Sequence, residues 1–128
     1  MAVPDGAERA RPFLPTRDYE VSKRFYQALG FETLLDGDVA IFGVGASAFL
    51  LHPPVQAGST SNLMMQLMVD DLDAWWAHIQ ALDLPANFGV AEPRPPAVQP
   101  WGLRIAYVFD PAGVLWHVAE RRAGAASD

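Results

Sequence analysis

Two histidines and a glutamate are the strongest candidates in this sequence for side chains that support catalysis. His117 and Glu120 lie three residues apart in an apolar segment near the end of the chain, and His52 precedes two prolines. An imidazole can act as a general acid or base, or bind a metal ion. Because a catalytic metal site needs about three protein ligands, the two histidines alone fall short of one. A two-histidine site stays an alternative, although a single histidine on a strand is more often structural.

Other routes to covalent chemistry are missing from the sequence. It has no cysteine, which removes thiolate nucleophiles, thiolate metal sites and disulfides. It has no Gly-x-Ser-x-Gly elbow, and Gly43 and Gly45 lie in a predicted hairpin with no helix after them to bind phosphate. The sequence therefore nominates no catalytic set and no cofactor.

Aromatic and methionine side chains offer a binding site instead. Trp101 follows a proline-rich segment at the start of a strand, where helix packing does not require a tryptophan. A stacked aromatic ring contributes roughly 0.5–1.5 kcal/mol beyond its burial, so Trp101 is the best ligand-binding candidate. The alternative is that Trp101 packs the loop against the sheet. Strand alternation places Met64, Gln66 and Met68 on one face, and methionines suit an adaptable apolar cavity.

An internal repeat defines the elements that must position these residues. Residues 18–31 align without a gap on residues 71–84, sharing an aspartate at the start and Gln-Ala-Leu near the end. Two copies are too few for a solenoid, which needs about three repeats. The repeat therefore predicts two copies of one supersecondary unit that pack on each other.

Each copy is predicted to have the order βαβββ, which gives an α+β fold. Asp18 and Asp71 suit helix N-caps, and Gly30 suits a left-handed helix end. A long loop with five prolines is expected over residues 85–100, and Asp110–Gly113 should form a turn. The tryptophans at helical spacing, Trp75 and Trp76, are expected in the core, as is Trp116. The strands are expected at residues 13–16, 39–42, 48–51, 63–69, 105–109 and 114–120.

Composition limits the remaining possibilities. A chain of 128 residues with 51% hydrophobic residues predicts one domain over 1–128, built of modules at about 12–52 and 62–120 with a linker at 53–61. The sequence has no apolar run of about 18 residues and no signal peptide, so a cytoplasmic protein without a membrane partner is expected. The net charge of -6 disfavours nucleic acid.

Several short segments resemble the vicinal-oxygen-chelate superfamily, which includes glyoxalase I, ring-cleaving dioxygenases, fosfomycin-resistance enzymes and bleomycin-resistance proteins. The resemblance is strongest to the bleomycin-resistance binding proteins. It implies two curved, partly closed sheets with the helices outside, and a homodimer with two interfacial clefts. The segments that carry the resemblance are Leu14–Asp18, Phe25–Phe31, Asp70–Leu72, Gln99–Gly102, Asp110–Gly113 and Val118–Glu120.

The resemblance also implies where a metal would be held. Enzymes of the superfamily place ligands at positions that correspond here to Arg11, Met64, the strand 48–51 and His117. Only His117 is a metal-binding residue type, so the resemblance implies that the inherited metal site is lost. A rebuilt site from His52 and His117 is the alternative.

The implied function is metal-independent binding and sequestration of an antibiotic-like compound, of the bleomycin family or another planar cation. The alternative is a superfamily enzyme of lyase, isomerase or dioxygenase type. Bleomycin binders tend to have aromatic residues near Gln66 and Val39, so the missing rings favour a different ligand. Phe49 lies on a strand whose facing the pattern leaves open. The predicted ligand-binding residues are Trp101, Met64, Gln66, Met68, His117, Val39 and Phe49.

Overall fold

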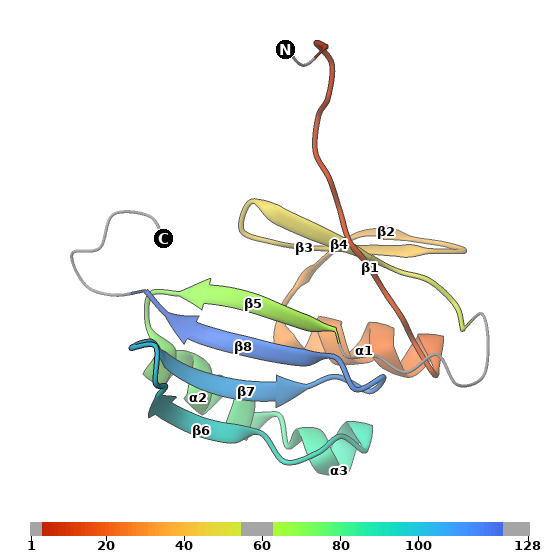
Figure 1. The fold of residues 1–128 in the computed structure, drawn as a ribbon. Helices are drawn as coiled ribbons and strands as arrows, with labels where there is room; N and C mark the ends of the chain where they lie inside the picture. The colour runs from red at the N-terminus through yellow and green to blue at the C-terminus, as the bar shows by residue number, and fades with distance from the viewer. Residues whose placement is uncertain (1–3, 55–62, 122–128) are drawn as a thin grey trace.

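The computed structural model describes residues 4–54 and 63–121 of the chain (Figure 1). Residues 55–61 of the predicted linker lie outside the described residues. The elements are, in order, β1 (Phe13–Leu14), α1 (Tyr19–Leu29), β2 (Glu32–Asp36), β3 (Ala40–Val44), β4 (Ser47–Leu51), β5 (Met64–Val69), α2 (Leu72–Ala81), α3 (Leu84–Phe88), β6 (Arg94–Val98), β7 (Arg104–Phe109) and β8 (Leu115–Glu120).

Two four-stranded sheets carry the fold. The N-terminal sheet has the strand order β1-β4-β3-β2, and the C-terminal sheet has the order β5-β8-β7-β6. In each sheet the first two of these strands pair in parallel and the other neighbours pair antiparallel. The two sheets therefore repeat one topology, which confirms the predicted α+β class, and among the described residues neither sheet closes into a barrel.

The starts of α1 and α2 and the end of α1 follow the predicted local chemistry. The Asp18 side chain accepts a hydrogen bond from the Val21 backbone N–H at 3.2 Å, and Asp71 accepts one from Ala74 at 3.0 Å. Gly30 ends α1 with a left-handed φ of 104°, a conformation that favours glycine. These caps confirm the start of both helices and the end of α1.

The expectation of an irregular loop over residues 85–100 is wrong. This segment contains most of α3 and the whole of β6. Pro85 lies at the start of α3, where its missing N–H costs no helical hydrogen bond. Pro95 and Pro96 lie in β6, which is an edge strand, and the pairing register shifts between Arg94 and Ala97. An edge position tolerates prolines because one side of the strand needs no ladder partner.

A single aromatic core joins the two sheets. Tyr26 of α1 is fully buried and lies 5.8 Å from Trp116 of β8, measured between ring centroids. The burial of Trp116 confirms that it belongs to the core. Trp75 and Trp76 were also expected there, but they are only half-buried at its margin. The members of this aromatic core are Phe25, Tyr26, Phe31, Phe42, Phe49 and Trp116.

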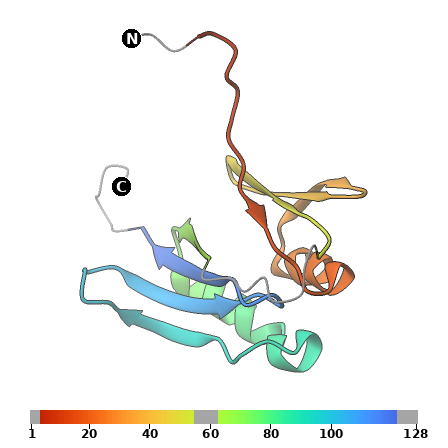
Figure 2. The same cartoon turned by 45° about the vertical axis from the view of Figure 1, so that its right-hand side comes forward.

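The helices leave one face of the C-terminal sheet uncovered. Figure 1 shows α2 and α3 behind this sheet, with the strands open toward the viewer. Residues 4–12 form an exposed N-terminal arm, whose first residues extend away from both sheets (Figure 2). No helix in the described part of the chain is long and apolar enough to cross a membrane.

Candidate functional site

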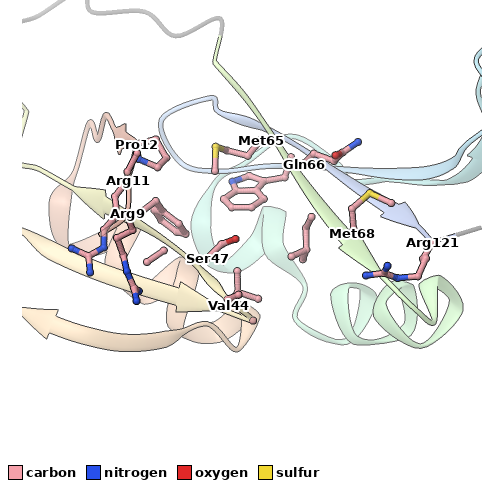
Figure 3. Close-up of a pocket in the computed structure, with 16 residues that line it drawn as sticks. Arg9, Arg11, Pro12, Val44, Ser47, Met65, Gln66, Met68 and Arg121 are labelled. Atoms are coloured by element: carbon pink, nitrogen blue, oxygen red, sulfur yellow. The ribbon is translucent and has the colours of Figure 1, made fainter. Parts of the chain in front are cut away.

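A cavity of about 580 Å³ lies between the N-terminal sheet and β5, the edge strand of the C-terminal sheet (Figure 3). The β3–β4 hairpin and the arm form one side of it. Side chains of β5, together with Trp116 of β8, form the other side. The apolar lining consists mainly of Phe49, Met65, Leu67, Met68 and Trp116, and the polar lining of Ser47, Gln66, Arg9, Arg11 and Arg121.

The cavity brings together three of the seven predicted ligand-binding residues. Gln66 and Met68 line it from β5, and Phe49 lines it from β4. Phe49 is only 2% exposed, and its ring lies 5.0 Å from Tyr26 and 5.6 Å from Trp116. Its main role is therefore in the aromatic core, with an edge that reaches the cavity.

The other four predicted residues lie outside this cavity. Met64 is 63% exposed at the start of β5, and Trp101 is 58% exposed in the turn between β6 and β7. Val39 lies in the bend between β2 and β3. His117 lies on β8 opposite Gln66, one step out of phase with the core residue Trp116. One copy of the chain therefore does not assemble the predicted set.

Trp116 is one of the cavity residues that sequence reasoning missed. It was assigned to the core alone, but the structure makes it both a core residue and a cavity wall. Met65 of β5 pairs with Trp116 of β8. Because β5 is the edge strand, only one strand separates Trp116 from the cavity, and the Trp116 side chain reaches the cavity lining. Strand order, which periodicity does not give, was the missing signal.

A buried hydrogen-bond network fixes the position of Trp116. Its indole Nε1–H donates to the Tyr26 hydroxyl at 3.0 Å, and that hydroxyl donates to the Asp110 carboxylate at 2.6 Å. The other Asp110 oxygen accepts from the backbone N–H groups of Ala112 and Val114, both at 2.8 Å. Burial raises the pKa of Asp110, and it raises the pKa of Tyr26 well above its ordinary value. The Asp110–Gly113 turn thus fixes, through Tyr26, the position of Trp116 in the cavity lining.

His117 is a polar residue on the face of the C-terminal sheet that the helices leave uncovered. Its ring packs edge-on against Tyr107, with 4.9 Å between the ring centroids. Its Nε2 atom is buried and has no hydrogen-bond partner among the described residues. Burial lowers the pKa of His117 below the ordinary value, so the neutral imidazole is favoured near neutral pH.

We expect the His117 imidazole to titrate below pH 6.5, its ordinary value. A folded-state pKa below the unfolded one means that the unfolded state takes up the proton first. This group's contribution to stability is therefore lost as the pH falls through 6.5 toward the folded-state pKa. NMR of ¹⁵N-labelled imidazoles against pH would measure this, with His117→Gln assigning the resonance. Titration at or above 6.5 would contradict it.

The residues present do not fit a divalent metal site. The part of the chain that the structure describes contains no group of three His, Asp, Glu or Cys side chains able to hold an ion. His52 lies against Phe13, with its Nδ1 atom 2.9 Å from the Pro53 carbonyl oxygen. Arg11 and Met64 occupy two of the positions where the resemblance implies ligands. The donor set therefore lacks the ligand number that metal catalysis requires.

Comparisons with known proteins agree with the fold described above. The sequence model of the Glyoxalase/Bleomycin resistance protein/Dioxygenase superfamily matches residues 9–118. A bleomycin resistance protein from Klebsiella pneumoniae is 29% identical over 112 residues, which cover 84% of this chain and 88% of that protein.

Two solved structures have the same fold. A bleomycin-binding protein in complex with bleomycin has a TM-score of 0.75 at 25% identity, covering 91% of this chain and 100% of its own. A lactoylglutathione lyase from Agrobacterium tumefaciens has a TM-score of 0.67 at 22% identity, covering 89% of this chain and 94% of its own. The same architecture therefore serves a binding protein and an enzyme.

Proposed function

Since this chain belongs to the Glyoxalase/Bleomycin resistance protein/Dioxygenase superfamily, we propose that it binds and sequesters a small, partly aromatic compound without a metal ion. The observation that carries this proposal is the cavity beside β5, which is lined by Trp116 and methionines. An aromatic wall and adaptable thioether side chains suit a flat organic ligand. Residues able to activate a substrate through a metal are lacking around it among the described residues.

Bleomycin-type compounds are the first ligands to test. A relative with 29% identity is a bleomycin resistance protein, and a structure with 25% identity was solved with bleomycin bound. The mechanism proposed for this chain is stoichiometric binding in the cytoplasm, which lowers the free concentration of the compound. Another planar cationic compound is the broader alternative within the same proposal.

Titration of bleomycin against tryptophan fluorescence tests the binding function. We expect saturable quenching, with Trp101→Phe weakening the affinity by roughly two- to ten-fold if its ring stacks on the ligand. The control is Trp75→Phe, because Trp75 is half-buried on α2, whereas the Trp101 ring is 58% exposed and free to meet a ligand. Equal effects of the two variants would remove Trp101 from the proposed site. Absence of saturable binding by any planar compound would remove the function.

Removal of metal should leave ligand binding unchanged. The titration would be repeated with and without EDTA, and the metal content of protein purified without chelators would be measured. We expect the same affinity within about two-fold and substoichiometric metal, because the donor set is too small for a catalytic ion. Stoichiometric zinc, manganese, nickel or iron would support the enzyme alternative instead.

His117 is the observation that favours a second candidate function. Its buried, unpartnered Nε2 atom and lowered pKa suit a neutral general base on the open face of the sheet. The alternative is therefore a superfamily enzyme of lyase, isomerase or dioxygenase type. Turnover of a bound compound that His117→Gln abolishes, with binding retained, would favour this alternative over sequestration.

We also propose that the chain forms a homodimer and that the second copy completes the ligand site. Large apolar side chains are exposed on the single copy, among them Met64, Val98 and Trp101. Exposed apolar side chains mark an interaction site where they lie together on one surface. Met64, Trp101 and His117 would then contact the ligand together with residues of the second copy.

Size-exclusion chromatography with light scattering should give a mass of twice the 14.0 kDa chain. Met64→Glu should shift the protein toward monomer, because it places a charge on an exposed apolar side chain of the proposed interface. Gln27→Glu, which adds the same charge at an exposed position on α1, should leave the dimer intact. A monomeric wild-type protein at micromolar concentration would contradict the dimer.

A further inference from the structure

The charge of the cavity is opposite to the charge of the chain. The protein carries a formal net charge of -6. Yet the cavity is lined by the three arginines Arg9, Arg11 and Arg121, and the residues that line it include no aspartate and no glutamate. Arginines gathered on one cavity of an acidic protein create a local positive potential that attracts anions and repels cations.

Among the residues that the structure describes, only part of this positive charge is neutralised. The Arg121 guanidinium lies 3.2 Å from an Asp70 carboxylate oxygen, so its charge is paired. Arg9 lies 4.0 Å from Glu8, and both side chains are more than half exposed, which makes this a weak pair. Arg11 has no ion pair among the described residues. The uncompensated charge is therefore at the arm end of the cavity.

The cavity has an apolar lining beside these charged side chains. Figure 3 shows Arg9 and Arg11 together at one end of the cavity and Arg121 at the other, with Met65 and Ser47 between them. Trp116 forms part of the same lining and is held in place by Tyr26. A ligand with an anionic group at the arm end would have its hydrocarbon body against these apolar side chains.

We propose that this cavity takes an amphipathic organic anion, in which a carboxylate, phosphate or sulfonate group is attached to an aromatic or aliphatic body. The inference rests on the proposed binding function and specifies its ligand class. Guanidinium groups donate parallel N–H bonds that match the geometry of carboxylate and phosphate oxygens. A planar cation, the class that the resemblance implied, would meet the uncompensated charge of Arg11.

Two probes with the same ring and opposite charge test this inference. Calorimetric titrations of the full chain would compare 1-naphthylacetate with 1-naphthylmethylammonium at one fixed ionic strength. We expect the anion to bind at least about ten-fold more tightly, because only it complements the arginines. A further titration with 1-naphthyl phosphate compares the two headgroups, since the ring is unchanged and only the anionic group differs.

Arginine variants test whether Arg11 is responsible for the preference for the anion. Arg11→Gln should weaken 1-naphthylacetate binding by about ten-fold and leave the cation unchanged or slightly tighter. Arg24→Gln is the matched control, because Arg24 is exposed on α1, outside the cavity, and loses the same charge. We expect Arg24→Gln to change the affinity for the anion by less than about two-fold.

The possible outcomes separate this inference from the function on which it rests. Tighter binding of the cation than of the anion would overturn the anion assignment and leave the proposed binding function standing. Equal losses of affinity for 1-naphthylacetate in the Arg11 and Arg24 variants would also overturn it, because the preference for the anion would then come from net charge alone. Failure of all three probes and of bleomycin to bind would contradict the binding function itself.

Discussion

Phe49→Ala should lower the free energy of unfolding by about 3–5 kcal/mol, as expected for truncation of a buried aromatic side chain. Phe49 is 2% exposed and packs against Tyr26, Phe31, Phe42 and Trp116, with ring-centroid distances of 5.0 to 6.1 Å. The loss would leave a void among rings that belong to both sheets. Urea denaturation followed by circular dichroism measures the change.

Phe13→Ala is the matched control for this prediction. Phe13 is 56% exposed, so the same truncation should cost less than about 1 kcal/mol. The comparison decides what Phe49 does in the molecule. If Phe49→Ala kept wild-type stability and lost only ligand affinity, Phe49 would be a free cleft wall, and its assignment to the aromatic core would be wrong.

Tyr26→Phe should destabilise the protein without changing its shape. The substitution removes the hydroxyl that accepts from Trp116 and donates to Asp110. Two buried polar atoms would lose a partner, and each costs about 1–3 kcal/mol. Tyr19→Phe is the control, because the Tyr19 hydroxyl donates to the Gly37 carbonyl at an exposed site. Removing it should lower the free energy of unfolding by only about 0.5 kcal/mol.

The cost of Tyr26→Phe should decrease as the pH falls. Burial raises the folded-state pKa of Asp110, and the hydrogen bond from Tyr26 partly lowers it again. A raised folded-state pKa means that this group adds stability as the pH falls through that value, and loses it as the pH rises. Without the hydroxyl the pKa rises further, so protonation of Asp110 at lower pH should recover part of the loss.

Denaturation at neutral pH and at about pH 5 would measure this difference between wild type and Tyr26→Phe. The wild-type protein provides the reference at each pH, so titration of other carboxylates largely cancels. A cost that stayed constant or grew at the lower pH would show that Asp110 is not the group left unsatisfied.

Local chemistry explains which parts of the fold were predictable. Asp18 and Asp71 cap helices because a carboxylate two or three residues before a free backbone N–H satisfies it whatever the rest of the chain does. Gly30 ends α1 for a similar reason, since its left-handed φ penalises other residues. The residue types at Arg11 and Met64, where the resemblance implies metal ligands, are likewise a property of the sequence alone.

Long-range pairing explains which parts were missed. The prolines of β6 suggested a loop, but their strand lies at a sheet edge where a missing N–H is tolerated. Trp116 was expected only in the core, and its second role depends on β5 being the outer strand beside β8. Edge positions are set by pairing between distant segments, which the periodicity of one segment does not contain.

By itself the sequence determined the internal repeat, the helix caps and the superfamily resemblance, because each depends on residue types at short spacing. Only the tertiary structure decided that Gln66, Met68 and Trp116 share a cavity with Arg9 and Arg11, while Met64, Val39, Trp101 and His117 lie elsewhere. The physical reason is that a cavity forms where separate sheets meet, so its lining and its charge are properties of the packing of distant segments.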